Sequence, residues 1–367
     1  MEEFEKDMGS ILAQQGISRR GFLKFCAFMA GTLALPLDKV PRVAAALESV
    51  SRPPAIWLEF QDCAGCTEAL LRASRPTVTE IVLDVLSVDY HETIMAAAGK
   101  QAEEAKASTI EAGGHLVIVE GSIPTKDNGL YCCIGGHTAM DILEEATRDA
   151  AAVIAVGNCA TFGGLPAANP NPTNAVGVRD LVKHIPVVNL PGCPLNAVNL
   201  TATVVHYLTF NSLPARDHLA RPLFAYGKRI HDNCERRSHF DAGQFVEEWG
   251  DEGHRLGWCL YKMGCKGPET YHNCPTVRYN DGTSWPIMAG HGCIGCSEPG
   301  FWDTMTPFYQ RLPEVPGFGV EATVDKLGLG MVALTAAGVA AHAIGSAVRK
   351  KMTAPASESP EQGDKDD

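Results

Sequence analysis

The sequence predicts an α/β protein that continues into a small irregular domain and ends in one membrane-spanning helix. Between about residues 47 and 220, short apolar runs alternate with longer segments of helical character. From 221 to 316 this periodicity fades, while glycine, proline, cysteine and charged residues increase. After a linker at 317–326, the 22 residues 327–348 lack a formal charge. These three changes define the expected domain order.

Residues 1–46 have the pattern of a twin-arginine export signal. Arg19 and Arg20 follow a polar stretch and precede the apolar run 25–37, and three alanines offer a cleavage point after Ala46. The alternative is an ordinary amphipathic helix that contains two arginines. Because every position of the motif is filled, we expect export by the twin-arginine translocation machinery.

Five apolar runs are the expected strands: 55–60, 80–86, 115–119, 152–156 and 186–190. Their alternation with helical segments predicts a flavodoxin-like parallel sheet with helices on both faces. Cysteines follow the first, fourth and fifth runs, where loops at the carboxyl ends of strands bring distant residues together. Four converging thiolates suit a [4Fe-4S] cluster, and half of a zinc site is the alternative. These thiols are Cys63, Cys66, Cys159 and Cys193.

The second domain supplies two further sets of candidate ligands. Four residues have a spacing that suits a second [4Fe-4S] cluster: His231, Cys234, Cys259 and Cys265. Three thiols remain, which fits a [3Fe-4S] cluster: Cys274, Cys293 and Cys296. A disulfide framework is the rival explanation, but disulfide-dense scaffolds are usually small, and a chain with 45% apolar residues can bury a large core.

The uncharged stretch 327–348 reads as a transmembrane helix, because about 33 Å of helix crosses a bilayer core. Basic residues 349–351 follow it and should be cytoplasmic, which leaves the body of the protein on the periplasmic side and a polar tail at 349–367. An apolar core helix is the alternative. Alanines and a glycine recur every four residues, which suits packing against a membrane partner. For His342 within the span, a functional role and a neutral, hydrogen-bonded packing role are both open.

Taken together, these motifs resemble the small subunit of membrane-bound nickel-iron hydrogenases over almost the whole chain. The matching segments are the export signal, 63–68, 119–124, 157–164, 191–194, 231–234, 290–299 and the terminal span. The resemblance implies a proximal, a medial and a distal cluster, held by the sets of Cys63, Cys274 and His231 respectively. It also implies a large subunit with the nickel-iron site, and electron transfer from hydrogen to a membrane cytochrome b or another quinone-linked acceptor.

Three details refine this expectation. Oxygen-tolerant members of the family have two extra cysteines near the proximal cluster, and here Gly65 and Gly164 stand at those positions, so we expect an oxygen-sensitive enzyme. Glu120 follows an apolar strand near the proximal set, where an interface role in proton movement or electrostatics and a merely satisfied carboxylate are both open. Cys132 and Cys133 are expected to be packed or unligated.

The composition excludes other functions. The net charge is -12 without a basic stripe, so nucleic-acid binding is not expected. The sequence has no phosphate-binding loop of the GxxxxGK[ST] form and no second pair of cysteine motifs for nickel, so a catalytic metal must come from a partner. The alternative function is an exported, membrane-anchored binding protein stabilised by zinc or disulfides.

Overall fold

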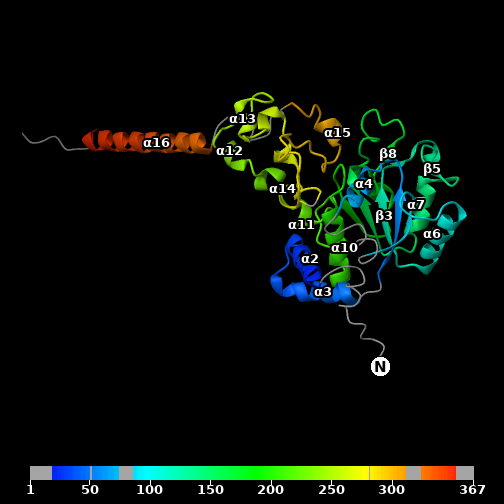
Figure 1. The fold of residues 1–367 in the computed structure, drawn as a ribbon. Coiled ribbons are helices and arrows are strands. Elements are labelled where there is room, and N and C mark those ends of the chain that lie inside the picture. The colour runs from blue at the N-terminus through cyan, green and yellow to red at the C-terminus, as the bar shows by residue number, and fades with distance from the viewer. Residues whose placement is uncertain (1–18, 50–51, 74–85, 281, 311–323, 353–367) are drawn as a thin grey trace, which may run out of the picture.

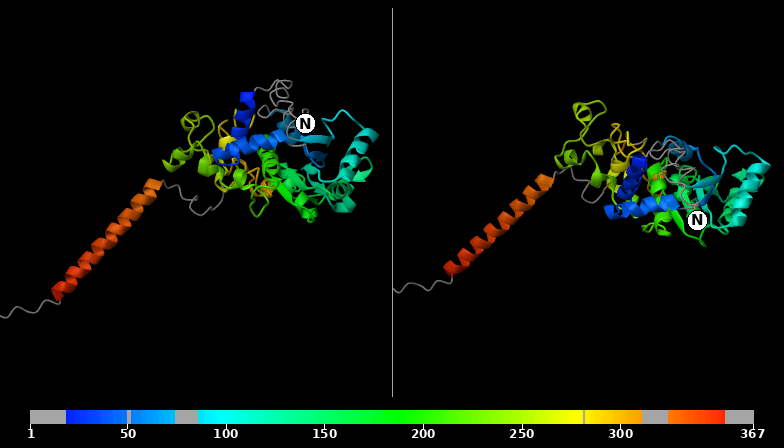
Figure 2. Two further views of the ribbon diagram at one scale, coloured as in Figure 1. Left: turned by 90° about the horizontal axis from the view of Figure 1, so that it is seen from below. Right: turned by 60° about the horizontal axis from the view of Figure 1, so that its bottom comes forward.

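The computed structural model describes residues 19–49, 52–73, 86–280, 282–310 and 324–352. Within them the chain forms an α/β domain, a cysteine-rich domain beside it, and a long C-terminal helix that projects away from both (Figure 1). Two further views show the same arrangement (Figure 2). The predicted fold class is confirmed.

Five parallel strands form the central sheet of the α/β domain. They are β1 Pro54–Glu59, β2 Ser87–His91, β3 Leu116–Glu120, β7 Ala152–Val156 and β9 Val187–Leu190. Their order across the sheet is β2-β1-β3-β7-β9, which is the flavodoxin-like order. The winding direction reverses between β1 and β3, and open sheets of this type bind ligands at the carboxyl edge next to that reversal.

One predicted strand, the run 80–86, lies almost wholly outside the described residues. Sequence reasoning missed β2, which follows that run directly and pairs with β1 at the edge of the sheet. Because β2 is an edge strand whose first three residues are only half-buried, it lacks the continuous apolar run of a strand covered on both faces. The other four predicted runs match observed strands to within one residue at each end.

Helices cover both faces of the sheet because successive side chains alternate between the faces. Ile56 and Val117 pack with helices α6 and α7, whereas Trp57 and Ile118 pack with α10. These helices are α6 Lys100–Ala112, α7 Ala139–Thr147 and α10 Ala197–Phe210. Shorter elements complete the domain: α4 Gly65–Leu71, β4 Ile123–Pro124, η3 Lys126–Gly129, β5 Cys133–Ile134, β6 His137–Thr138, α8 Gly157–Phe162, β8 Ala175–Val176 and α9 Val178–Leu181.

The described part of the predicted export signal is helical and packs on the α10 face of the sheet. Its elements are α2 Arg19–Thr32, η1 Leu37–Lys39 and α3 Val40–Ser49. Met29 and Val43 are fully buried in the same core as Trp57. The predicted cleavage point after Ala46 therefore lies inside α3 in the uncleaved chain.

The cysteine-rich domain is built from short helices joined by turns. They are α11 Leu223–Tyr226, η4 Ile230–Asn233, α12 Arg237–Asp241, α13 Glu252–Arg255, η5 Tyr261–Met263, η6 Gly267–Glu269, α14 Cys274–Val277 and α15 Phe301–Thr304. None of these helices is longer than five residues. The main buried cluster of this domain includes Cys265, Cys274 and Cys293, so predicted ligands make up part of its core.

Helix α16, Val324–Met352, is the one helix of the described residues that is long and apolar enough to cross a membrane. Its candidate span is Leu329–Arg349, and none of that span is buried against the rest of the chain. The alternative of a core helix is therefore wrong. The predicted polar tail lies almost wholly outside the described residues.

Candidate metal centres

Four thiols meet at the carboxyl edge of the sheet. Cys63 and Cys66 follow β1, Cys159 lies in α8 just after β7, and Cys193 follows β9. Burial, together with the charges of nearby Cys193 and Cys63, raises the pKa of Cys159 to about 12. Burial also raises the pKa of Cys66, with contributions from Glu120, Cys159 and Cys193. The predicted first set is thus brought together.

The surroundings of these thiols fit a metal-sulfur cluster. A methyl group added at Gly157 would lie 2.4 Å from the Cys66 sulfur, and one at Gly164 would lie 2.4 Å from the Cys159 sulfur. The backbone N–H of Leu195 donates to the Cys66 sulfur at 3.4 Å, as is common around cluster sulfurs. All cysteines of the chain lie in the described residues, and none of them is in a disulfide there. Buried thiols with raised pKa values become thiolates when a metal supplies positive charge.

Glu120 is the last residue of β3, and its carboxylate is hydrogen-bonded to the backbone of the first cysteine motif. Its carboxylate accepts hydrogen bonds from the backbone N–H groups of Cys66 (2.9 Å) and Thr67 (3.0 Å) and from the Thr67 hydroxyl (2.7 Å). Burial raises the pKa of Glu120 to about 7, although these hydrogen bonds oppose the shift. Glu120 is 2% exposed and satisfied within the chain. Its proposed role in proton movement stays a prediction.

Sequence reasoning missed Glu59, which stands opposite Glu120 in the register of β1 and β3. Single oxygens of Glu59, Asp62 and Glu120 lie within 4.8 Å of one another. The Thr67 hydroxyl lies 3.0 Å from Glu59 as well as 2.7 Å from Glu120. Because one hydroxyl has one proton, it donates to one carboxylate at a time. A charged residue inside the apolar run 55–60 was the signal that marked this site.

The second predicted set surrounds a small cavity in the cysteine-rich domain. Its lining includes all four predicted ligands, His231, Cys234, Cys259 and Cys265. Burial, together with the charge of Arg237, lowers the pKa of His231 to about 4, so its imidazole is neutral at neutral pH, which is the form that binds metals. The backbone N–H of Arg236 donates to the Cys234 sulfur at 3.4 Å. This environment also fits a cluster.

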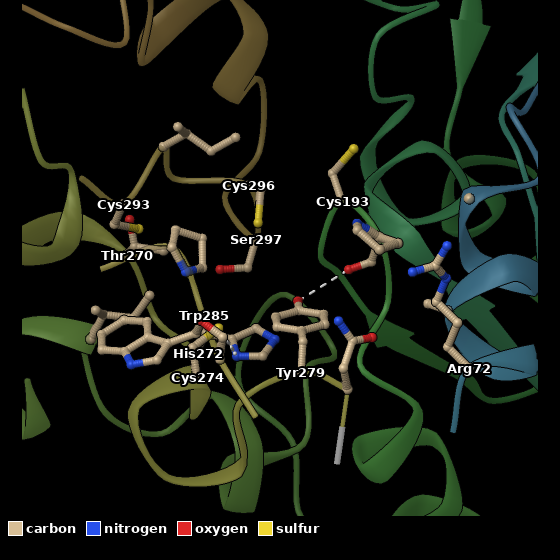
Figure 3. Close-up of a pocket in the computed structure, with 18 of the residues that line it drawn as sticks. Arg72, Cys193, Thr270, His272, Cys274, Tyr279, Trp285, Cys293, Cys296 and Ser297 are labelled. Atoms are coloured by element: carbon tan, nitrogen blue, oxygen red, sulfur yellow. Dashed lines mark hydrogen bonds between the residues drawn. The ribbon is translucent and has the colours of Figure 1, made fainter. Parts of the chain in front are cut away.

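The third predicted set lines a cavity of about 440 Å³ between the two domains (Figure 3). Cys274, Cys293 and Cys296 lie along one part of the cavity, and Cys193 of the first set faces it from the α/β domain. Nδ1 of His272 lies 3.0 Å from the Cys274 sulfur, and the N–H of Gly295 donates to the Cys293 sulfur at 3.4 Å. The three thiols therefore line one cavity, and the sulfurs of Cys274 and Cys293 each have a polar neighbour.

The three sets lie in a row. Burial, together with the charge of the Cys296 thiolate across the cavity, raises the pKa of Cys193, and this interaction places the third set next to the first. The backbone N–H of Cys293 donates to the Cys265 sulfur at 3.3 Å, which places the third set next to the second. The three-thiol set thus lies between the other two. Cys132 and Cys133 lie on the β5–β6 hairpin and join none of the sets.

Known proteins match this chain along most of its length. A family model for the C-terminal part of the NiFe/NiFeSe hydrogenase small subunit matches residues 226–309, and one described as NADH ubiquinone oxidoreductase, 20 Kd subunit, matches 63–207. The uptake hydrogenase small subunit of Azotobacter vinelandii is 47% identical over 342 residues, which span 93% of this chain and 95% of that protein. The quinone-reactive Ni/Fe-hydrogenase small chain of Wolinella succinogenes is 47% identical over 344 residues, covering 91% and 97%.

Solved structures agree. The nickel-iron-selenium hydrogenase of Desulfomicrobium baculatum matches with a TM-score of 0.67 and 35% identity, covering 71% of this chain and 100% of that chain. The chain therefore belongs to the family of nickel-iron hydrogenase small subunits. Within that family it falls among the uptake hydrogenases. Members of this family hold iron-sulfur clusters and pair with a large subunit that has the catalytic site, so the alternative of a binding protein is not supported.

Proposed function

We propose that this chain carries electrons away from the nickel-iron site of a large subunit when that site oxidises hydrogen. The observation that carries the proposal is the row of three ligand sets. It begins at the exposed cysteines Cys63 and Cys193 on the sheet edge. The other end of the row is the second set, which includes Cys265. Lys266, next to Cys265, donates hydrogen bonds to the carbonyls of Pro307 and Gln310, which are among the last described residues before helix α16.

In this proposal each set holds one cluster. The proximal [4Fe-4S] cluster has the ligands Cys63, Cys66, Cys159 and Cys193. The medial [3Fe-4S] cluster has Cys274, Cys293 and Cys296, and the distal [4Fe-4S] cluster has His231, Cys234, Cys259 and Cys265. The clusters would supply one-electron redox chemistry. The chain's residues hold them and donate N–H groups to their ligand sulfurs.

The electron acceptor is a membrane cytochrome b or a similar quinone-reducing protein. Support comes from α16, whose apolar span is followed by basic residues that favour the cytoplasmic side. The relative from Wolinella succinogenes is named quinone-reactive. With twin-arginine export, the body of the protein lies on the periplasmic side, where hydrogen oxidation releases its protons.

The proximal cluster is of the standard type, and the enzyme is sensitive to oxygen. The support is the absence of additional thiols beside the ligands. Gly65 and Gly164 adjoin ligand sulfurs, since a Cβ atom at either position would lie 3.1 Å from the Cys63 sulfur or 2.4 Å from the Cys159 sulfur. Both positions carry hydrogen instead of an additional thiol. Hydrogen oxidation by the purified complex after exposure to air tests it, and rapid full recovery without reductive activation would contradict oxygen sensitivity.

One serine substitution in each set tests the ligand assignment on the heterodimer of small and large subunits. We expect Cys66→Ser and Cys259→Ser each to lower the iron content by up to about four, and Cys274→Ser to lower it by up to about three. Cys132→Ser is the control and should leave iron content unchanged. An unchanged iron content in any of the three ligand variants would remove that set from the proposal.

A further inference from the structure

Asn158 connects the first ligand set to the third. It lies in α8 next to Cys159 and is 2% exposed. Its side-chain Nδ2 donates to the carbonyl oxygen of Cys296 at 3.0 Å and to that of Glu298 at 3.1 Å. The carboxamide thus donates both of its N–H groups to the loop that contains Cys296. Cys296 is 138 residues and Glu298 is 140 residues away in sequence.

The backbone of the same residue holds a second proximal ligand. The N–H of Asn158 donates to the carbonyl oxygen of Gly192 at 2.7 Å, immediately before Cys193. Asn158 therefore contacts the loops of Cys193 and Cys296 and is bonded to Cys159. The sulfur atoms of Cys193 and Cys296 flank the cavity between the domains (Figure 3).

The two residues that follow Cys296 are held by Arg221, which lies at the boundary between the two domains. One guanidinium nitrogen of Arg221 donates to the Ser297 carbonyl at 3.2 Å and to the Glu298 carboxylate at 3.1 Å. Arg221 is 3% exposed and is itself held by Asp217 at 2.8 Å. Arg221 thus holds the loop at Ser297 and Glu298, whereas the contact with the Cys296 carbonyl itself is made by Asn158.

A second buried asparagine shows what an ordinary packing role looks like. Asn189, on β9, is 1% exposed, and its Nδ2 donates to the Leu219 carbonyl at 2.9 Å. In both asparagines the Oδ1 atom has no hydrogen-bond partner among the described residues. The two differ in what they hold: Asn189 contacts no predicted ligand segment with its amide, whereas Asn158 joins two of them.

We propose that Asn158 is a positioning residue that sets the separation and relative orientation of the proximal and medial clusters. This inference rests on the proposed function, because it needs both clusters. Electron tunnelling slows steeply with distance, so a side chain that ties Cys159 directly to the Cys296 backbone controls the first step along the row. Its two hydrogen bonds hold the spacing even though the ligands belong to different domains.

The test compares Asn158→Ala with Asn189→Ala in the complete large-small complex. Iron anomalous diffraction measures the separation of the proximal and medial clusters, and EPR with redox titration measures the line shape and midpoint potential of the medial cluster. We expect the Asn158 variant to change the separation and the medial signal. The Asn189 variant should match the parent protein in both, although each loses a buried hydrogen-bonding side chain.

An Asn158→Ala complex that is indistinguishable from Asn189→Ala in cluster separation, line shape and potential would overturn the proposal. If the alanine variant does not load its clusters, Asn158→Ser, which retains one hydroxyl donor, decides the same comparison. Absence of a [3Fe-4S] signal in the parent protein would instead contradict the proposed function, so the two failures are distinguishable.

Discussion

The α/β domain holds its predicted ligands on loops beyond a complete sheet, whereas the cysteine-rich domain includes its ligands in its core. Both faces of the sheet are buried by helices, and among the four proximal thiols only Cys66 belongs to either core cluster. In the cysteine-rich domain, Cys265, Cys274 and Cys293 are members of a small buried cluster beside Trp285 and Ile287. The two domains are thus stabilised differently.

This difference indicates which part of the fold depends on metal. A parallel sheet with two apolar faces buries enough surface to be stable without a cofactor. Helices of five residues or fewer are unstable alone and need tertiary contacts or metal to persist. We therefore expect the clusters to act as cofactors for the α/β domain and as structural elements for the cysteine-rich domain.

Removal of the clusters by a chelator and oxidant should have the largest effect. We expect amide hydrogens in the cysteine-rich domain to lose their protection from exchange, whereas those of β1, β3, β7 and β9 keep it. Hydrogen exchange with mass spectrometry measures both in one sample. Equal loss of protection in the two domains would break the comparison.

Arg221→Met tests the seam between the two domains. The substitution leaves Asp217 and Glu298 without their buried cation, which typically costs about 3–5 kcal/mol. Thermal unfolding of the complex should show the loss mainly in the cysteine-rich domain. Arg179→Met, which changes an exposed arginine, is the control and should have little effect. If Arg221→Met left the thermal stability unchanged, the ion pairs of Arg221 with Asp217 and Glu298 would not stabilise the contact between the two domains.

Gly157→Ala, compared with Gly114→Ala, tests whether the first ligand set needs a glycine beside the Cys66 sulfur. Gly157 and Gly114 both have positive φ, +78° and +70°, so alanine at either costs about 1–2 kcal/mol. A methyl group at Gly157 meets the Cys66 sulfur, whereas at Gly114 it meets nothing within 4 Å. We expect only Gly157→Ala to lower iron content and the proximal signal. Equal iron content in the two variants would contradict the requirement for a glycine beside the Cys66 sulfur.

The smallest effect concerns the pH dependence of the α/β domain. Burial raises the pKa of Glu92 from its ordinary 4.5 to about 7, so the folded state favours the protonated acid. Its contribution to stability is present below pH 4.5 and is lost as the pH rises to about 7. Relative to Glu92→Gln, the parent protein should therefore lose stability from about pH 5 to about pH 7.5 in denaturant titrations. Glu104→Gln, at an exposed position, should show no such difference.

Much of the fold was predictable because its signals are local. Four of five strands appear as apolar runs, since strands covered on both faces need apolar residues at every position. The edge strand β2 was missed because half-buried residues such as Asp89 interrupt its pattern. The cysteines marked the ligand sets, because thiols in these spacings have few other uses.

The polar residues that support the ligands were not predictable. Asn158 contacts Cys296 across 138 residues, and Arg221 contacts Glu298 across 77, so no local pattern reveals either pair. Tyr279 is similar, since its hydroxyl donates to the Pro194 carbonyl beside Cys193 at 3.2 Å across the cavity (Figure 3). These contacts exist only after the two domains have docked.

The most direct measurement is iron and acid-labile sulfide per small subunit in the purified complex, together with an EPR spectrum of the oxidised protein. Two four-iron clusters and one three-iron cluster require about eleven irons, with the near-isotropic signal of an oxidised [3Fe-4S] centre. That result would establish a three-cluster path through these ligand sets. Zinc in place of iron, or metal-free chains with disulfide-paired thiols, would contradict it.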